Sequence, residues 1–510
     1  MILGIFNTIE YRSIDDVQLA LAGFAQAGDF DSGLRLISEF VQAVFRDSRA
    51  LAKVFHESSL DAECQAIGAS IRLTVGQYSP AGPTAGTVFL ATELYGAGGH
   101  TGVIDDLIRS GCFEEPITIL LTDALGTADV DGTRLRFKDQ LVAVEVLRDG
   151  SFAQKTESTL IRLGELSPKN LLLFNHHQDS IAIAAAQPGL APNAIFYHHG
   201  DHHLCLGATL SHTRHVDPSP MGFHNCRELV GLSANEYWPL SAPDLGMIAN
   251  RSFMKDGTLR TCSSGSRAKF EQPYRFSYSD VVPRILATSG GSHLHIGALS
   301  EETMRQLFEN LDHLAIDRSR FMHMNSVPSV WRALQEHGVD VYLGSFPVSG
   351  GRAAVEVMGS GTPMIGHDSY RSRFHGGADM LYPSAYVWRT LDDLCIHLSQ
   401  LSRTDLEDQS QAARAYYDIN HTERALRASI LKQLNAPEPL PLRPFLPDEM
   451  QTYLDEAHDY CDVSVATRLL SNAQESLREH QRYLNAIFAS RTWKLASFIG
   501  RLARLVRPRR

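Results

Sequence analysis

The sequence predicts an α/β protein in which two parallel-sheet domains face a cleft, with helical additions at both ends. Two observations carry this prediction. From residue 87 to about residue 435, short apolar runs alternate with stretches of helical periodicity. Such alternation is typical of βαβ units and a doubly wound sheet. It is interrupted between residues 250 and 278 by a polar, irregular stretch, which we interpret as the connection between two domains.

Composition excludes several classes of protein. The 510 residues are 44% hydrophobic and 21% charged, as in a soluble globular chain with two or more domains. A net charge of -11 argues against general nucleic-acid binding. The seven Cys form no C-x-x-C motif, which fits free thiols in a reducing compartment. With no signal-peptide pattern and no apolar run of 18 residues, we expect a cytoplasmic protein without a membrane span.

Residues 1–80 are expected to form a helical cap. Apolar residues recur at helical spacing from residue 14, and the pattern breaks at Gly28 and Asp29. The phrase A-x-A-G-D-F-x-x-G-L resembles one tetratricopeptide-type helical hairpin, although no repeat of that length follows. Such a cap would pack on the next domain or dock a partner. The Pro/Gly-rich stretch 78–86 is the expected boundary.

Residues 85–250 are expected to form the first sheet domain. Strands are predicted at 87–92, 117–122, 171–174 and 195–197. Three of these strands are followed by Gly- or His-rich loops, with sequences GGH at 98–100, NHHQD at 175–179 and HHGDHHLCLG at 198–207. Because the carboxyl ends of parallel strands meet at one edge of a sheet, we expect these loops to converge there and bind a ligand.

Residues 280–435 are expected to form the second sheet domain, which ends at the Pro-rich stretch 435–447. We predict strands at 284–288, 293–297, 320–324 and 339–343, with helices at 300–313 and 328–336 between them. This alternation is that of a nucleotide-binding half-sheet. The loop MNSVPS after the third strand is the expected contact for a base.

The stretch from Val339 to Gly366 indicates the chemistry of this domain. A buried strand leads into the loop SFPVSGG, which ends at Gly350 and Gly351, and a helix containing Glu356 follows. Backbone N–H groups and the helix dipole at such a point favour a phosphate. Glu356 can accept a charge-assisted hydrogen bond from a ribose hydroxyl, and Arg352 can pair with a diphosphate. An ordinary α/β crossover with a Gly-rich turn is the alternative.

The same stretch, with its Phe-Pro, Ser-Gly-Gly and G-x-G-T-P-M-I elements, resembles the donor-binding segment of GT-B glycosyltransferases, in particular the O-GlcNAc-transferase-like branch. The resemblance implies two Rossmann-like domains and a nucleotide-diphosphate sugar as donor substrate, with no further cofactor and no metal. It also implies six donor-binding residues: Pro347, Ser349, Gly350, Gly351, Arg352 and Glu356. Many retaining members carry two Glu here, and Val348 stands at the first position. This departure favours inversion.

The loop at 198–207 resembles a segment, x-H-x-D-H-x-x-x-L-G, of bacterial polysaccharide glycosyltransferases. The resemblance implies catalytic roles for His199, Asp201 and His202, while the loop of Gly98, Gly99 and His100 resembles an acceptor or phosphate loop. A His paired with Asp can deprotonate an acceptor hydroxyl, and a cationic His can stabilise a leaving diphosphate. Two alternatives stay open: Zn²⁺ bound by these side chains, or polar loop histidines without a chemical role.

Residues 445–510 are expected to form a helical tail with a basic amphipathic end. Seven Lys and Arg residues surround six large apolar residues that can share one side of a helix. The apolar residues are Phe488, Trp493, Phe498, Ile499, Leu502 and Leu505. Such a helix can lie on an anionic membrane surface. The S-R-T-W-K-L phrase also resembles tails of polysaccharide-assembly transferases. A helix packed on the first sheet domain, or a basic tail in solvent, is the alternative.

Together these features predict a glycosyltransferase that moves a sugar from a nucleotide-diphosphate sugar to an acceptor hydroxyl in bacterial surface polysaccharide or glycoconjugate assembly. The acceptor would be a glycan, a lipid-linked glycan or a protein. The expected location is the cytoplasm, with a peripheral position on the inner membrane face if the tail binds the membrane. Alternatives are a protein O-glycosyltransferase, a nucleotide-sugar epimerase on the same fold, or a non-catalytic scaffold.

Overall fold

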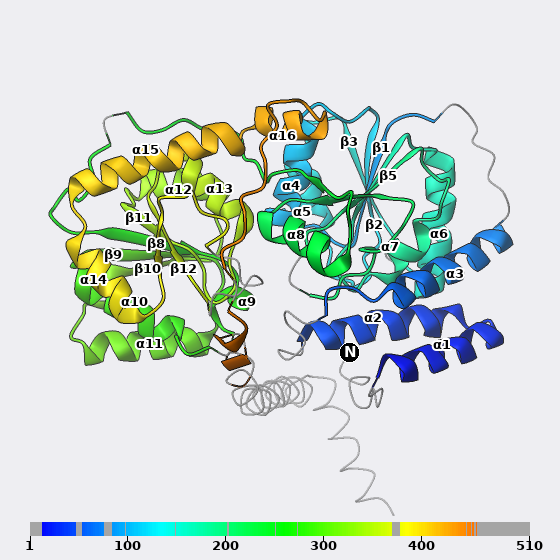
Figure 1. Cartoon of the computed structure of the whole chain (residues 1–510), viewed down its shortest axis with the longest axis horizontal. Coiled ribbons are helices and arrows are strands. Elements are labelled where there is room, and N and C mark those ends of the chain that lie inside the picture. Colours follow the sequence, from blue (N-terminus) through cyan, green and yellow to red (C-terminus); the bar gives the residue numbers. More distant parts are fainter. Residues whose placement is uncertain are drawn as a thin grey trace, which may run out of the picture.

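The computed structural model describes residues 13–46, 54–75, 84–96, 98–147, 149–200, 203–249, 251–272, 274–369, 378–444, 446–449, 451, 452 and 455. Two α/β lobes lie side by side, and the first helices of the chain run along one of them (Figure 1). The predicted basic helix at 488–510 lies outside the described residues, as do Asp201 and His202. Within the described residues, no helix has the length and apolar character needed to cross a lipid bilayer.

The N-terminal lobe is built on a sheet of seven parallel strands in the order β3-β2-β1-β4-β5-β6-β7. The strands are β1 (Thr87–Ala91), β2 (Ile117–Leu121), β3 (Val142–Val146), β4 (Asn170–Phe174), β5 (Asn193–Tyr197), β6 (Arg214–Asp217) and β7 (Glu236–Tyr237). The helices are α4 (Gly99–Arg109), α5 (Val130–Arg136), α6 (Phe152–Leu166), α7 (Ser180–Ala185), α8 (Pro220–Asn225) and the π-helical turn η2 (Cys226–Val230). Apolar runs such as ITILL are buried throughout, as expected for strands covered on both faces.

The helical cap comprises α1 (Ile14–Ala27), α2 (Phe30–Arg46) and α3 (Ser58–Val75). The predicted break falls at Gly28, whose positive φ of 69° closes α1. The cap does not have a core of its own. Its apolar side chains, including Leu34 and Ile67, join one continuous core with strand β1 and helices α6 and α7.

Helix α3 also holds the segment that follows the histidine loop. The carboxylate of Asp61, 4% exposed, accepts hydrogen bonds from the Gly207 N–H at 2.7 Å and from Thr209, at 3.0 Å from its N–H and 2.6 Å from its hydroxyl. In addition, the ring of Phe45 in α2 stacks on His177 with centroids 3.9 Å apart. The cap therefore positions the loops at the carboxyl edge of the first sheet.

The C-terminal lobe contains a six-stranded parallel sheet in the order β10-β9-β8-β11-β12-β13. Its strands are β8 (Arg260–Ser264), β9 (Ser292–Ile296), β10 (Phe321–Met324), β11 (Val341–Leu343), β12 (Met364–His367) and β13 (Tyr386–Trp388). Its helical segments are α9 (Arg267–Phe270), α10 (Tyr278–Ser289), α11 (Glu301–His313), η3 (Arg318–Arg320), α12 (Val330–Glu336), α13 (Gly351–Gly359), α14 (Leu391–Gln400), α15 (Arg403–Asn420) and α16 (Glu423–Ile430).

The prediction that residues 250–278 are irregular was wrong. They contain β8, a central strand of the second sheet, and the short helix α9. Strand β8 reads RTCSS, and its last four residues are buried although three of them carry hydroxyl groups. Small polar side chains give no apolar signal, and only pairing with β9 and β11 makes this segment a strand.

The prediction of a strand at 284–288 was also wrong, because these residues lie within helix α10. Pro283 stands in the helix interior and cannot donate to the carbonyl of Ser279. The side chain of Asn310, in α11, replaces the missing donor at 2.9 Å from that carbonyl oxygen. Val281, Val282, Ile285 and Leu286 all face the core, so tertiary burial stabilises a helix that proline would otherwise break.

The chain returns to the N-terminal lobe at helix α16. Helix α16 packs on α4, and Leu426 is buried in the core of the first sheet (Figure 1). Arg427 donates to the Ser110 carbonyl at 2.6 Å, and His421 bonds the Leu240 carbonyl at 2.8 Å. These contacts hold the two lobes together on one side of the space between them.

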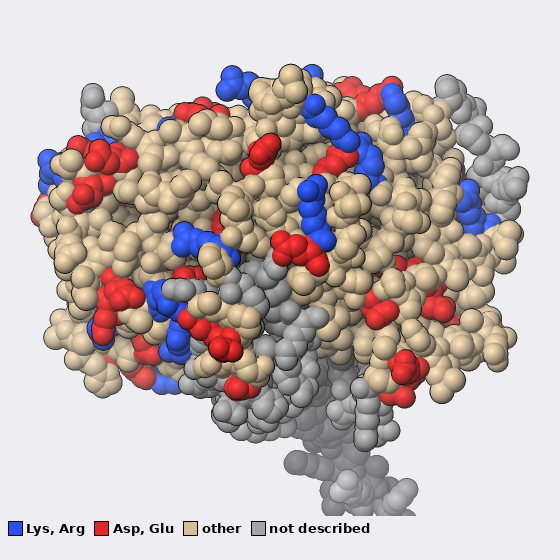
Figure 2. Space-filling model, viewed as in Figure 1, with Lys and Arg blue, Asp and Glu red and all other residues tan. Residues whose placement is uncertain are grey.

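Charge is dispersed over the face drawn in Figure 2. Small groups of Lys and Arg alternate there with small groups of Asp and Glu across both lobes. Some charged side chains pair along one helix, such as Arg305 with Glu302 and Glu309 in α11.

Candidate donor and catalytic site

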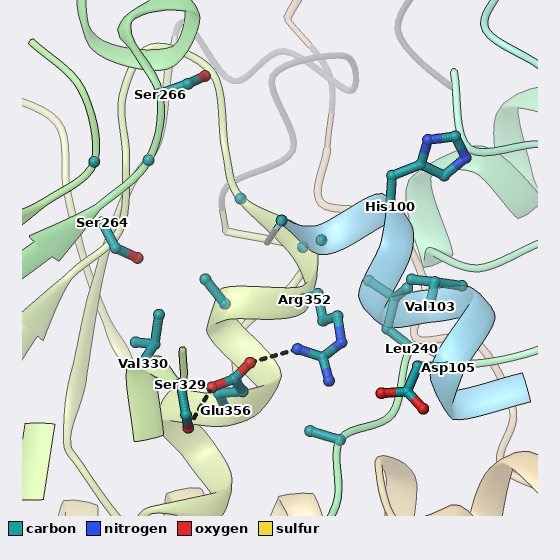
Figure 3. Close-up of a pocket in the computed structure, with 18 of the residues that line it drawn as sticks. His100, Val103, Asp105, Leu240, Ser264, Ser266, Ser329, Val330, Arg352 and Glu356 are labelled. Carbon is teal, nitrogen blue, oxygen red and sulfur yellow. Dashed lines mark hydrogen bonds and ion pairs between the residues drawn. The ribbon is translucent and has the colours of Figure 1, made fainter. Parts of the chain in front are cut away.

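A single cavity of about 980 Å³ lies between the two lobes and is lined by both. The N-terminal lobe contributes the start of α4 and the ends of β4 and β5. The C-terminal lobe contributes the loops after β8, β9, β10 and β11. Figure 3 shows helix α4 with His100 and Asp105 on one side, opposite Ser264, Ser329 and Glu356 on the other. The cavity thus lies at the carboxyl edges of both parallel sheets, where open α/β proteins bind ligands.

On the C-terminal wall, the cavity coincides with the point where the strand order reverses. Strands β8 and β11 are neighbours, and the loops that follow them turn to opposite sides of the sheet. The loop after β11 ends at Gly350, which stands immediately before helix α13. No side chain caps this helix, so its first backbone N–H groups are available to an anion in the cavity.

A cation lies beside this helix start. Lys269 of α9 lines the cavity and donates from Nζ to the Ser349 carbonyl at 3.0 Å. A Cβ atom added to Gly350 would lie 3.1 Å from the same Nζ. The chemistry of the uncapped helix start and the ammonium group is compatible with a negatively charged group such as a diphosphate.

Glu356 lies one and a half turns into α13 and contacts both the start of α12 and Arg352 in its own helix. Its carboxylate accepts from the Ser329 hydroxyl and from the Trp331 N–H, both at 3.1 Å, so it binds the N-terminus of α12. It also pairs with Arg352 (Figure 3). This arrangement places the base loop predicted after β10 in the cavity, where residues 326–331 form part of the lining.

Arg352 joins the two lobes. Its side chain is 12% exposed and its guanidinium binds Asp106 of α4, with Nε 2.8 Å from one carboxylate oxygen and Nη2 3.2 Å from the other. Because it also pairs with Glu356, its charge is offset by two acidic residues. Desolvation raises the pKa of Asp106 to about 6 although Arg352 acts in the opposite direction. The contact to a diphosphate that the sequence predicts for Arg352 stays a prediction.

Three histidines meet on the N-terminal wall. His100 follows β1, His176 follows β4 and His199 follows β5, so the predicted convergence of the three loops is observed. The ring centroids of His100 and His199 lie 4.1 Å apart, and those of His100 and His176 lie 5.3 Å apart. His100 and His199 line the cavity.

Burial keeps these imidazoles neutral. Desolvation, followed by the neighbouring histidines, lowers the pKa of His199 to about 3 and that of His100 well below its usual value. Burial also lowers the pKa of His176. In the free protein the three rings are therefore neutral, and pKa values this low also make them weak bases. The predicted cationic role of a histidine stays a prediction for His202, which lies outside the described residues.

Most of the other predicted site residues line the cavity, but not all of them do. Gly98 and Gly99 line the cavity at the start of α4, and Ser349, Gly350 and Gly351 line it from the other lobe. Pro347 is absent from this lining, and its carbonyl accepts a hydrogen bond from Ser369 at 3.2 Å. Asp201 and His202 lie outside the described residues, so their roles stay predictions.

Comparison with known proteins identifies the fold. No protein-family model matches the sequence, and no curated protein matches it. Among solved structures, HepE of Anabaena in complex with UDP and glucose aligns over 68% of this chain and 98% of its own, with a TM-score of 0.50 and 10% identity. The fold is GT-B. The HepE complex with UDP-glucose gives the same TM-score and coverage. An O-GlcNAc transferase mutant of Thermobaculum terrenum covers 88% of this chain and 82% of its own, with a TM-score of 0.47 and 14% identity.

Within this GT-B fold, sequence reasoning missed Lys269 and the loop Ser264–Ser266. Both belong to the stretch that was predicted to be irregular, although Ser264, Gly265 and Lys269 line the cavity. The available signal was T-C-S-S-G-S-x-x-K, in which a Gly precedes a basic residue by four positions. A Gly-containing turn followed by a short helix with Lys is a pattern that phosphate-binding loops use.

Proposed function

We propose that this GT-B protein is a glycosyltransferase that uses a nucleoside-diphosphate sugar as donor. The observation that carries the proposal is one cavity with complementary walls. An uncapped helix start with Lys269 stands on the C-terminal wall, and neutral His100 and His199 stand on the N-terminal wall. The first wall suits the diphosphate and the second suits an acceptor hydroxyl.

In the proposed reaction, the bond between the anomeric carbon and the β-phosphate oxygen breaks, and a bond from that carbon to the acceptor oxygen forms. The acceptor proton passes to His199, and the nucleoside diphosphate leaves with the bonding electron pair. Lys269 and the N–H groups at Gly350 and Gly351 stabilise the charge that develops on the leaving diphosphate. Val348 stands at the position that the resemblance assigns to the first Glu of many retaining GT-B enzymes, and we therefore propose a single displacement with inversion.

Glu356 is proposed to bind the ribose, and residues 326–331 the base. Because Glu356 also binds the start of α12, it sets the position of this loop relative to α13. For the acceptor, we propose a glycan or lipid-linked glycan of a bacterial surface polymer. The basic tail would bind an anionic membrane and so bring the protein close to this acceptor. A protein acceptor, an epimerase and a non-catalytic scaffold are the alternatives.

A panel of nucleoside-diphosphate sugars tests the proposal. A bound donor is expected to raise the melting temperature of the full chain, since a ligand that binds only the native state stabilises it. Release of nucleoside diphosphate, accelerated by an acceptor glycan, distinguishes transfer from donor isomerisation. Stabilisation without any turnover would favour the scaffold, and conversion of the sugar without acceptor would favour the epimerase.

Replacing Lys269 by alanine is expected to raise the dissociation constant for the nucleoside diphosphate about 10- to 100-fold. A charge-assisted hydrogen bond to phosphate contributes about 1.5–3 kcal/mol, which corresponds to that range. Isothermal titration of both proteins measures the change. Lys255→Ala is the matched control, because Lys255 is exposed and absent from the cavity lining. Equal affinity of Lys269→Ala and the parent would place the diphosphate elsewhere.

A further inference from the structure

A second group of chemically reactive side chains lies behind the cavity, in the N-terminal lobe. It consists of His198, which follows β5, His215 and Asp217 in β6, and Cys226 at the start of η2. All four are buried, with exposed fractions of 2%, 7%, 0% and 1% respectively. One ligand atom from each lies within 4.8 Å of every other. Three chain segments therefore bring four potential metal ligands to one point.

Four of the six distances between these ligand atoms come close to the edges of a coordination tetrahedron. His198 Nδ1, Asp217 Oδ1 and Cys226 Sγ form a triangle with sides of 3.1, 3.2 and 3.2 Å, and His215 Nε2 lies 3.3 Å from the same carboxylate oxygen. Zinc–nitrogen and zinc–sulfur bonds of about 2.0–2.3 Å separate tetrahedral ligand atoms by about 3.3–3.8 Å. The triangle is only slightly smaller than one face of such a tetrahedron.

Hydrogen bonding alone accounts poorly for this triangle. The imidazole Nδ1 and the thiol supply at most one hydrogen each, whereas the triangle has three contacts. One short contact is then left without a hydrogen. A cation at the centre would instead face a lone pair from each ligand atom.

A divalent ion is also compatible with the charges of this group. A thiolate from Cys226 and the carboxylate of Asp217 carry two negative charges, which Zn²⁺ neutralises, while the imidazoles stay neutral. Burying a neutral cluster avoids the cost of an unpaired charge in the lobe interior.

A supporting contact orients the carboxylate. Asn235 Nδ2 donates to the other oxygen of Asp217 at 2.7 Å and to the Phe223 carbonyl at 3.0 Å. This leaves Oδ1 directed at the two histidines and Cys226. Ligating carboxylates in metalloproteins are held by such outer hydrogen bonds.

We propose that His198, His215, Asp217 and Cys226 form a structural zinc site. With four protein ligands the site is closed, so the ion would not contact substrate. The ion would instead position residues of the cavity wall. His198 immediately precedes His199, and Ser219 and Met221, which lie between Asp217 and Cys226 in the sequence, line the cavity. The ion would fix the end of β5, and with it His199, against β6 and α8. The proposal concerns residues distinct from the His199, Asp201 and His202 set and does not depend on the proposed transferase activity.

Metal analysis of the full chain, purified without chelator, tests the proposal. We expect close to one zinc per chain by mass spectrometry, and a lower melting temperature after chelation that Zn²⁺ restores. Replacement of the ion by Co²⁺ is expected to produce visible bands of a tetrahedral site and a thiolate-to-cobalt charge-transfer band. These measurements on the unchanged sequence decide the matter even where a variant fails to fold. Protein that binds neither Zn²⁺ nor Co²⁺ would overturn the proposal.

Variants then locate the ion. Cys226→Ala is expected to lose the zinc and the charge-transfer band. Cys262→Ala is the matched control and is expected to keep both, because Cys262 is equally buried but lies in β8 of the other lobe. His100, His176 and His199 are a second group with close ligand atoms. Zinc that persists in Cys226→Ala and is lost in His176→Ala would assign the ion to that group and refute the proposed site.

Discussion

Replacing His199 by alanine is expected to lower the turnover number at least about 10²-fold, the usual contribution of a positioned general base. His199 lines the cavity at the end of β5, and burial beside His176 and His198 lowers its pKa to about 3. The ring is therefore neutral but weakly basic in the free protein, and we expect the negative charge of a bound donor diphosphate to raise its basicity so that it can take the proton of an acceptor hydroxyl. The measured quantity is the rate of nucleoside-diphosphate release at saturating donor and acceptor.

Donor affinity provides the first control for this variant. Because the diphosphate is proposed to bind on the opposite wall, His199→Ala is expected to bind the nucleoside diphosphate as tightly as the parent. His212→Ala provides the second control, since His212 bonds the Ala186 carbonyl at 2.8 Å and is absent from the cavity lining. A His199→Ala protein with a near-normal rate would mean that another group accepts the proton, and Asp201 and His202 would be tested next.

Replacing Gly68 by alanine is expected to destabilise the protein by about 3 kcal/mol, the upper range for overpacking a close-packed core. Gly68 lies in α3 where this helix crosses α7. An added Cβ would lie 1.8 Å from the Ala184 carbonyl oxygen and 2.6 Å from the Gln187 amide nitrogen. The helices must separate to admit it. We expect a lower melting temperature, measured by circular dichroism.

Gly23→Ala is the matched control, because Gly23 also lies in a cap helix but an added Cβ has no neighbour within 4 Å. Alanine is favoured over glycine in a helix, so this variant is expected to be as stable as the parent or slightly more stable. Gly68→Ala should also reduce turnover at temperatures near its transition, since α3 carries Asp61, which binds the segment after the histidine loop. Equal melting temperatures for the two variants would show that α3 is not closely held against α7.

The sequence alone determined the alternation of strands and helices and the character of the donor loop. Apolar runs such as ITILL and NLLLF are strands because they are buried on both faces, and their signal is local. Gly350 precedes α13 and Gly351 is its first residue, so the predicted loop leads into the predicted helix, because strand, turn and helix follow one another within a few residues. The order of the loops after β1, β4 and β5 likewise predicted that their histidines meet, since parallel strands share one carboxyl edge.

Only the tertiary structure decided which polar segments enter the core and which distant residues meet. Strand β8 carries hydroxyl side chains and depends on its two neighbours, and α10 contains Pro283 and depends on Asn310 from another helix. Lys269 reaches Ser349 across 80 positions of sequence. The group of His198, His215, Asp217 and Cys226 has no spacing typical of a metal motif. In each case the deciding interaction is non-local, and local propensity carries no information about the partner that satisfies a buried polar group.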